Sequence, residues 1–386
     1  MDIITREEVK ELCRHAEAPC VSIHMPTHRT AGSTVEDRLR FKNLVGEAQD
    51  RLTGAGMRRP EAVELLGPLH KLHRDDAFWM RTLEGLAAFV APGFFRRYAL
   101  PAAFAEHLDA GERFQVRPLA ALLPLGGRYH VLAVDKNGST LHEGDGYELR
   151  ALELPPATPR SLADVLRLYS LENLLDFHTR TPHVGAGGLR TAVFHSDKET
   201  EIALKQRVAE YFRLVDRGVA RSLREKSAPL VLVGVEYLTT MYREVSSQPH
   251  LFAESVVCSP ERLTAAELHK RTWALVGAHF DKPRRDALAA FPNLLSAGKA
   301  TGDPEEVLVA AGQGRVWSLL CLRDERLWGT FDAARGRLDV ADGPRPGATD
   351  VSNLAAIMAI ETGAAVHEAA PGELPAGVAI GALLRS

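Results

Sequence analysis

Hydrophobic positions recur along this chain with two different periods, and the changes between them divide it into elements. Between residues 35 and 52, apolar residues recur every three or four positions and stop at two glycines, which predicts a helix. Residues 20–25 alternate like a half-buried strand, whereas residues 85–91 and 229–234 are continuous apolar runs, typical of strands buried on both faces. Helical and strand patterns in one chain predict an α/β protein.

Capping and turn residues place several boundaries more closely. Thr5 followed by Glu8 forms a capping box for a first helix, and Asp303 with a proline after it predicts another helix start. A helix from residue 60 to about 72 and a helical stretch over 264–291, interrupted at Pro283, are also expected. Residues 128–144 predict a β-hairpin, because Asn137-Gly138 favours the turns that match strand twist.

The length of 386 residues exceeds one ordinary core and indicates two or three domains. Changes of pattern place boundaries near 125 and 260, giving an N-terminal domain over 1–125, a middle domain over 126–260 and a C-terminal domain over 261–386. In the middle domain a long helix from about 197 to 226 precedes the apolar strand at 229–234, as in a sheet covered on both faces.

Composition narrows the class of protein. Hydrophobic residues make up 45% of the chain, charged residues 25%, and the net charge is −3, so any RNA contact must use local basic patches. Apolar runs fall far short of the roughly 20 residues that span a bilayer, and the N-terminus lacks a secretory pattern, so we expect a cytoplasmic protein without membrane contact. The four scattered cysteines predict reduced thiols.

A glycine-rich loop at residues 181–190 is the most unusual local feature. Its three glycines, Gly185, Gly187 and Gly188, permit positive φ and outward-facing amides, as anion-binding loops require, although mobile surface loops share this composition. Nearby are four residues with metal-binding side chains: Asp176, His178, His183 and His195. Their spacing matches no recognised metal site, and no hydrolase motif occurs, so we expect no cofactor, no metal and no catalytic residue.

Two basic patches are candidates for binding RNA phosphates. On the predicted helix over 197–226, Arg213, Arg217, Arg221 and Arg224 recur with helical period opposite an apolar face. In the N-terminal domain, residues 27–29 with Arg38, Arg40 and Lys42 form a second patch. Each arrangement also suits an ordinary solvated surface, and Glu210, Asp216 and Glu225 lie close to the first.

The order of several segments along the chain resembles that of one family. The segments are 19–29, 92–98, 129–144, 175–179, 215–218, 229–238 and 311–316. Together they resemble bacterial archaeo-eukaryotic release factor family 3, within the peptide-release factor superfamily that includes Pelota. This resemblance implies an N-terminal decoding-like domain, a middle RNase H-like domain and a C-terminal α/β/α sandwich similar to kink-turn-binding ribosomal proteins.

The resemblance also identifies a departure from the release factors, whose middle domain carries a Gly-Gly-Gln tip for ester hydrolysis. The corresponding residues here are Gly187, Gly188 and Leu189, and with Gly185 and Arg190 they are the expected contact to the peptidyl-transferase centre. A leucine side chain cannot orient water, which predicts loss of hydrolysis, so the chain is expected not to act as an enzyme. The backbone N–H of Leu189 could still stabilise an oxyanion, which leaves a ribosome-rescue peptidyl-tRNA hydrolase as the alternative.

The stop-codon motif of the decoding domain has only a faint counterpart at residues 40–43, where Lys42 is a candidate RNA contact. A tRNA-mimicking body without reading or hydrolysing motifs predicts a ribosome-associated translation factor that occupies the A site, in ribosome hibernation or the response to stalled ribosomes. Its expected partners are rRNA and ribosomal proteins, and a delivering translational GTPase stays open. A metal-dependent nuclease that uses Asp176 and the loop histidines is a third reading.

Overall fold

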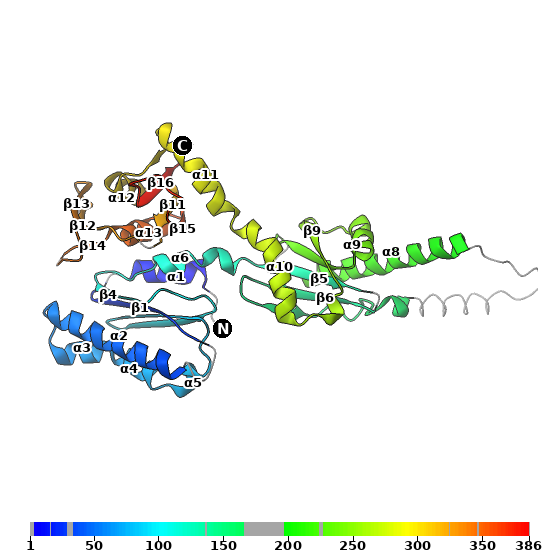
Figure 1. Cartoon of the computed structure of the whole chain (residues 1–386), viewed down its shortest axis with the longest axis horizontal. Helices are drawn as coiled ribbons and strands as arrows, with labels where there is room; N and C mark the ends of the chain where they lie inside the picture. Colours follow the sequence, from blue (N-terminus) through cyan, green and yellow to red (C-terminus); the bar gives the residue numbers. More distant parts are fainter. Residues whose placement is uncertain are drawn as a thin grey trace, which may run out of the picture. The chain divides into compact units, whose positions relative to one another are not determined.

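The computed structural model describes residues 4–15, 17–28, 34–135, 137–165, 197–223, 227–323, 325–345 and 347–385. The chain forms two compact units, one made of Met1–Gly126 together with Asp281–Ser386 and the other of Gly127–Phe280. Both units combine helices with sheets (Figure 1), so the expected α/β multidomain class is confirmed.

The N-terminal part of the first unit is built on an antiparallel sheet in the order β3-β2-β1-β4. Its strands are β1 (Cys20–Pro26), β2 (Gly85–Ala91), β3 (Phe94–Leu100) and β4 (His107–Gly111). Its helices are α1 (Arg6–Arg14), α2 (Thr34–Gly54), α3 (Arg59–Leu65), α4 (Gly67–His73), α5 (Asp76–Trp79), α6 (Arg117–Ala120) and the 3-10 helix η1 (Leu123–Gly126).

Alternate residues of this sheet enter two different cores. Ile23 and Val90 pack with Phe41 and Leu69 of α2 and α4 on one face. Phe89, on the other face, packs in a core that α1, α6 and the C-terminal helices complete. Both faces of the sheet are therefore buried, and every apolar side chain of β2 enters one of the two cores. This is why the sequence of β2 is a continuous apolar run.

The C-terminal part of the first unit contains two further sheets, in the orders β10-β16-β11-β15 and β13-β12-β14. The strands are β10 (Ala300–Thr301), β11 (Val316–Leu322), β12 (Trp328–Asp332), β13 (Arg337–Ala341), β14 (Thr349–Asp350), β15 (Ala365–Ala369) and β16 (Ile380–Leu384). Three helices, α11 (Lys282–Ser296), α12 (Pro304–Gly312) and α13 (Val351–Glu361), cover the first of these sheets on its two faces.

The two ends of the chain are joined in the first unit by buried polar contacts as well as by a shared apolar core. The side chain of Asn353 accepts from the backbone N–H of Val116 at 2.9 Å and donates to the carbonyl of Phe114 at 2.9 Å. The buried Arg117 guanidinium donates to the carbonyl of Leu322 at 2.7 Å. Because buried polar groups must find partners, these contacts fix how residues 114–117 meet the C-terminal part.

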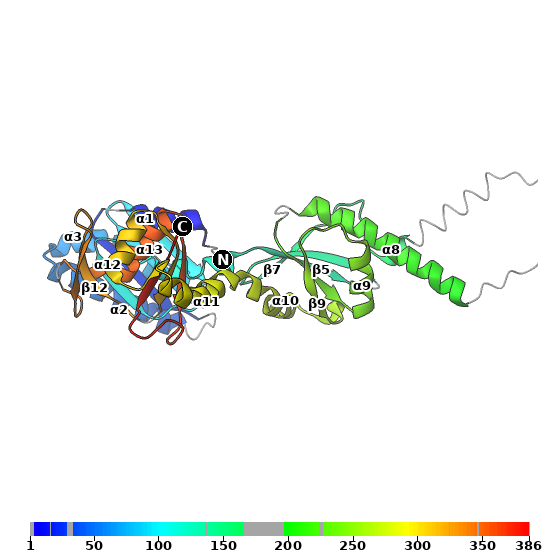
Figure 2. The same cartoon turned by 90° about the horizontal axis from the view of Figure 1, so that it is seen from above.

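The second unit is a single five-stranded sheet in the order β7-β6-β5-β8-β9. Its strands are β5 (Tyr129–Val134), β6 (Ser139–Gly144), β7 (Leu149–Leu152), β8 (Leu230–Gly234) and β9 (Leu251–Val257). Strands β5, β8 and β9 are parallel, and β6 is antiparallel to both of its neighbours. Helices α8 (Asp197–Ser222) and α9 (Glu236–Val245) cover one face and α10 (Ala265–Phe280) the other, with η2 (Pro260–Arg262) before α10 (Figure 2).

Several elements confirm the sequence predictions, and a few differ for clear reasons. The hairpin β5–β6, the buried strand β8, the Thr5–Glu8 capping box and the break at Pro283 are all present. The helix expected over 60–72 is divided into α3 and α4 at Gly67-Pro68. The second unit extends to Phe280, beyond the boundary placed near 260, because α10 packs Leu268 and Val276 against the sheet of that unit.

Candidate functional site

The glycine-rich loop lies outside the described residues. This holds for Gly185, Gly187, Gly188, Leu189 and Arg190, for the four residues considered as metal ligands, and for Arg224. The structure does describe α8, which begins at Asp197 after the loop in sequence. The candidate site that can be built from geometry therefore starts with this helix.

Three arginines form an exposed row on α8, named here the α8 ridge: Arg213, Arg217 and Arg221. The opposite face of the helix is buried, with Phe212, Val215 and Val219 packed against the sheet. Residues four apart in a helix are separated by roughly 6 Å along the axis, so the three guanidinium groups follow one line. No described acidic side chain forms an ion pair with any of the three, so their charges remain available to an anionic partner.

The buried Asp216 lies between two ridge arginines in sequence but faces away from them. Its carboxylate accepts hydrogen bonds from the Tyr242 hydroxyl at 2.7 Å, the Ser246 hydroxyl at 2.8 Å and the Ser247 backbone N–H at 3.0 Å. The Ser247 hydroxyl and the Gln248 amide donate as well, at 2.6 and 3.1 Å. Burial pushes the pKa of Asp216 upward, but these hydrogen bonds outweigh it and hold the pKa below its ordinary value. This carboxylate therefore anchors α8 to the segment after α9 and does not neutralise the ridge.

Gly218, on the buried side of the same turn, allows a close approach between α8 and the preceding segment. A Cβ atom at this position would lie 2.2 Å from the Thr158 hydroxyl oxygen. The segment 215–218, one of those that suggested a family, thus supplies a buried anchor, an exposed arginine and a packing glycine within one helical turn.

The second basic patch, named here the α2 patch, consists of Arg38, Arg40 and Lys42. It differs from the α8 ridge because two of its side chains form ion pairs. Arg38 forms an ion pair with Asp76 at 2.6 Å, and Arg40 forms one with Glu106 at 3.2 Å. Lys42 is exposed, and no ion pair joins it to a described acidic residue. The structure therefore leaves this patch with one free cation among its three described basic side chains. Lys42 as an RNA contact stays a prediction.

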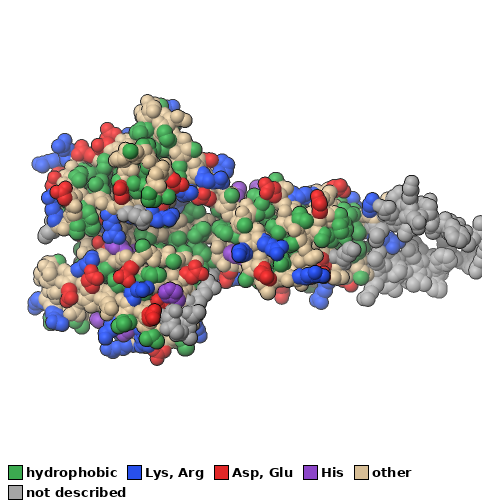
Figure 3. All heavy atoms as spheres, viewed as in Figure 1, with side chains coloured by type: hydrophobic (Ala, Val, Ile, Leu, Met, Phe, Trp, Pro, Cys, Tyr) green, Lys and Arg blue, Asp and Glu red, His purple; other side chains and the backbone are tan. Residues whose placement is uncertain are grey.

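Basic side chains do not form one continuous patch on the face of the molecule shown in Figure 3. Lys and Arg side chains there alternate with Asp and Glu over both units. This pattern agrees with the net charge of −3 and favours recognition by local rows of arginine over a broad basic surface.

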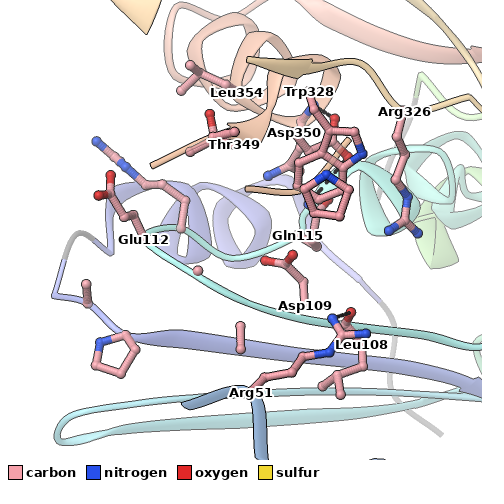
Figure 4. Close-up of a pocket in the computed structure, with 18 of the residues that line it drawn as sticks. Arg51, Leu108, Asp109, Glu112, Gln115, Arg326, Trp328, Thr349, Asp350 and Leu354 are labelled. Carbon is pink, nitrogen blue, oxygen red and sulfur yellow. Dashed lines mark hydrogen bonds between the residues drawn. The ribbon is translucent and has the colours of Figure 1, made fainter. Parts of the chain in front are cut away.

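A cavity of about 1400 Å³ in the first unit was not anticipated from the sequence. It lies between β4 of the N-terminal part and β12, β14 and α13 of the C-terminal part. Figure 4 shows the Asp109 side chain directed from β4 into this space, with Trp328 above it and Arg326 to one side. Gln115 is buried beneath the tryptophan and donates to Asp350 at 3.4 Å.

The charged groups of the cavity are strongly affected by burial. Burial raises the pKa of Asp109 to about 6, and the nearby Asp350 carboxylate contributes. Burial also lowers the pKa of Arg326, whose guanidinium donates to His107 Nδ1 at 2.8 Å. The pKa of His107 falls to about 2 through burial and then through the Arg326 charge, so this imidazole is neutral.

No sequence signal could have assembled this cavity. Asp109 and Gln115 come from one end of the chain, whereas Arg326, Trp328 and Asp350 come from the other. Among the described residues, no cluster of three metal-ligating side chains occurs, and no helix has the length and apolar character needed to cross a membrane.

Similarity to known proteins is found among solved structures and in one family model. No curated protein matches it. Among solved structures, similarity is found to the archaeal translation termination factor aRF1, with 14% identity, 99% of both chains covered and a TM-score of 0.26. A model of ribosome-bound archaeal Pelota and ABCE1 gives 13% identity over 100% of this chain and 95% of that one, with a TM-score of 0.35.

A third solved structure is that of S. cerevisiae Dom34, a translation termination-like factor that interacts with Hbs1. It shows 9% identity over 77% of this chain and 74% of its own, with a TM-score of 0.33. The sequence was also matched by the model of one protein family over residues 128–315, which include all of β5 to α12. The model is that of bacterial archaeo-eukaryotic release factor family 3, so the resemblance indicated by the sequence is confirmed over residues 128–315.

Proposed function

We propose that this protein is a ribosome-associated translation factor that occupies the A site without catalysing peptide release. The observation that carries the proposal is the match of residues 128–315 to a release factor family, since those residues include the glycine loop. The replacement of the catalytic glutamine by Leu189 supports a non-catalytic role, because leucine offers no group that could position water. Ribosome hibernation, or a response to stalled ribosomes, is the process that such an occupant would serve.

The α8 ridge supports a role in contacting rRNA. Arginine binds phosphate through charge-assisted hydrogen bonds, and three guanidinium groups in a row, without ion-pair partners in the described part of the chain, can each contact a phosphate of one strand. Contacts of this kind release counterions, so binding weakens steeply as salt rises. The ridge follows the loop that we propose as the tip, so the two would enter the ribosome together.

The finer domain identities belong to the same proposal. They comprise the decoding-like domain over 1–125, the RNase H-like domain over 126–260 and the kink-turn-binding-protein-like domain over 261–386, together with a cytoplasmic location and delivery by a translational GTPase. The shared core of the two chain ends supports a body in which the first and third of these domains act together.

Sedimentation through a sucrose gradient tests the proposal. The tagged full-length protein should migrate with 70S particles or a subunit, in growing or starved cells, and added salt should release it. The variant Arg213→Gln/Arg217→Gln/Arg221→Gln should remain near the top of the gradient. A matched control, Arg150→Gln/Arg262→Gln/Arg271→Gln, removes the same charge from exposed positions of the same unit and should migrate like the unaltered chain. Absence from ribosomes under both growth conditions would refute the proposal.

A peptide-release assay separates a passive occupant from a rescue hydrolase. Stalled complexes that carry labelled peptidyl-tRNA should retain their peptide when the protein is added. Release that disappears in a Gly188→Trp variant would instead establish hydrolysis through backbone groups of the loop.

A further inference from the structure

The cavity of the first unit has no part in the proposed ribosome contacts. It nevertheless contains charged side chains that form no ion pair with another described residue. Asp109 forms no hydrogen bond or ion pair with another described residue, although it is half-buried and its side chain points into the cavity (Figure 4). A carboxylate that points into a cavity of this size and has no partner among the described residues is available to accept hydrogen bonds from a bound molecule.

Arg326 provides the complementary charge on the neighbouring wall. Of its several N–H donors, one bonds His107 Nδ1 at 2.8 Å, and no described carboxylate lies within ion-pairing distance. Arg51, also at the cavity, differs because its guanidinium already binds the Leu108 carbonyl and Glu47. The free acceptor at Asp109 and the free donors at Arg326 thus face one space (Figure 4).

The Trp328 ring adds an aromatic surface to this pair. It is partly buried at the start of β12, and Figure 4 places it above Gln115 and Asp109. A half-buried tryptophan next to unpaired polar groups is the arrangement by which proteins hold an unstacked base, with the ring on its face and polar groups along its edge.

The geometry points to a site for a guanine base, held between the Trp328 ring, the Asp109 carboxylate and the Arg326 guanidinium. Guanine presents adjacent N–H donors at N1 and N2, which a carboxylate accepts, and acceptors at O6 and N7, which arginine donates to. Adenine and cytosine each offer one amino group to the carboxylate and so match it less fully. The cavity exceeds the usual size of a small-ligand pocket, which leaves room for ribose and phosphate.

The base could belong to a free guanine nucleotide or to an unpaired guanosine in RNA, because both present the same edge and face. This inference does not depend on ribosome binding, since a chain that never sediments with ribosomes could still bind the nucleotide.

Isothermal titration of the full-length protein tests the site. The probes are GMP, IMP, which lacks the 2-amino group, AMP, and two RNA hairpins that differ in one unpaired loop base, G or A. We expect GMP or the G hairpin to bind and IMP and AMP to bind about tenfold to a hundredfold more weakly, as the loss of one well-formed base contact predicts. Binding of GMP assigns a free nucleotide, and binding of the G hairpin without GMP assigns an RNA base.

Substitutions then locate the binding. Asp109→Asn and Arg326→Gln should each reduce the preference for guanine, and Trp328→Leu should weaken all bases alike. The exposed controls Asp342→Asn and Arg323→Gln, which do not line the cavity, should change nothing. Thermal melting identifies any variant that is unfolded, and for such a variant the comparison of GMP with IMP on the unaltered chain decides. No binding at millimolar concentration, equal binding of all bases, or an unchanged preference in folded Asp109→Asn would overturn the proposal.

Discussion

The α8 ridge and the α2 patch look alike in sequence, yet they differ in the folded protein. Each places three described basic side chains along one helix, but the arginines of the α8 ridge are unpaired among the described residues, whereas Arg38 and Arg40 of the α2 patch pair with Asp76 and Glu106. Both partners come from other segments of the chain. Counting charges along a helix therefore overestimates a binding surface when acids from elsewhere approach it.

Asp216 explains how the ridge keeps its charge. An acidic residue between Arg213 and Arg217 would be expected to weaken the patch, but its carboxylate is buried among donors from Tyr242 to Gln248. In the sequence Asp216 appeared to weaken the basic patch. In the structure it anchors the helix that carries the α8 ridge.

Replacing this anchor should give the largest effect. The Asp216 carboxylate accepts from five donors, and Asp216→Asn replaces one of its two oxygens with an amino group that cannot accept, so we expect the free energy of unfolding of the second unit to fall by about 3 kcal/mol. Chemical denaturation, with hydrogen exchange of α8 and α9 to localise the loss, measures this. The control Glu210→Gln, on the same helix, should cost less than about 0.5 kcal/mol. Equal effects of the two variants would show that Asp216 is no anchor.

The same anchor gives a pH dependence with a defined sign. The pKa of Asp216 is below its ordinary value in the folded chain, so its contribution is fully present above the unfolded pKa of about 3.9. The contribution is lost as pH falls through the folded pKa. Unfolding measured from neutral pH into the acid range should therefore show a smaller loss of stability for Asp216→Asn than for the unaltered chain.

Binding to ribosomes should distinguish the two basic patches directly. In a plot of log affinity against log salt, Arg213→Gln/Arg217→Gln/Arg221→Gln should reduce the slope by about 2 to 3, as expected for three lost phosphate contacts. The corresponding triple variant of the α2 patch, Arg38→Gln/Arg40→Gln/Lys42→Gln, should reduce it by less than about 1, since Lys42 is its one free cation among the described residues. Equal slopes would remove the distinction.

Gly218 tests whether the ridge helix needs its close contact with Thr158. Gly218→Ala gains helix propensity but places a methyl group against a buried side chain, so we expect a net loss of about 1 to 2 kcal/mol. Thr158→Ala removes both the hydroxyl and the methyl group that the new side chain would meet, so the double variant should recover part of this loss, as a double-mutant cycle would show.

Local signals predicted much of the fold, and contacts distant in sequence limited the rest. The β5–β6 hairpin, the helix caps at Thr5 and Asp303 and the buried β8 follow from neighbouring residues. The β13-β12-β14 sheet escaped notice because its strands are short and partly exposed, and β12 pairs with β14 across about twenty residues. The cavity required residues from both chain ends, which no local pattern links.

The smallest effect on stability is expected for substitutions in the α2 patch, and they test whether ion pairing is what distinguishes the two basic helices. Exposed ion pairs contribute at most about 1 kcal/mol, so Arg38→Gln should lower the free energy of unfolding by less than that. Asp76→Asn should have a similar cost but should also free the Arg38 charge, and ribosome affinity should then rise at low salt. If the ion pair with Asp76 prevents Arg38 from binding RNA, Asp76→Asn strengthens ribosome binding and Arg38→Gln leaves it unchanged. Opposite results would mean that Arg38 contacts RNA despite its partner, and the difference between the two helices would then lie in position and not in charge.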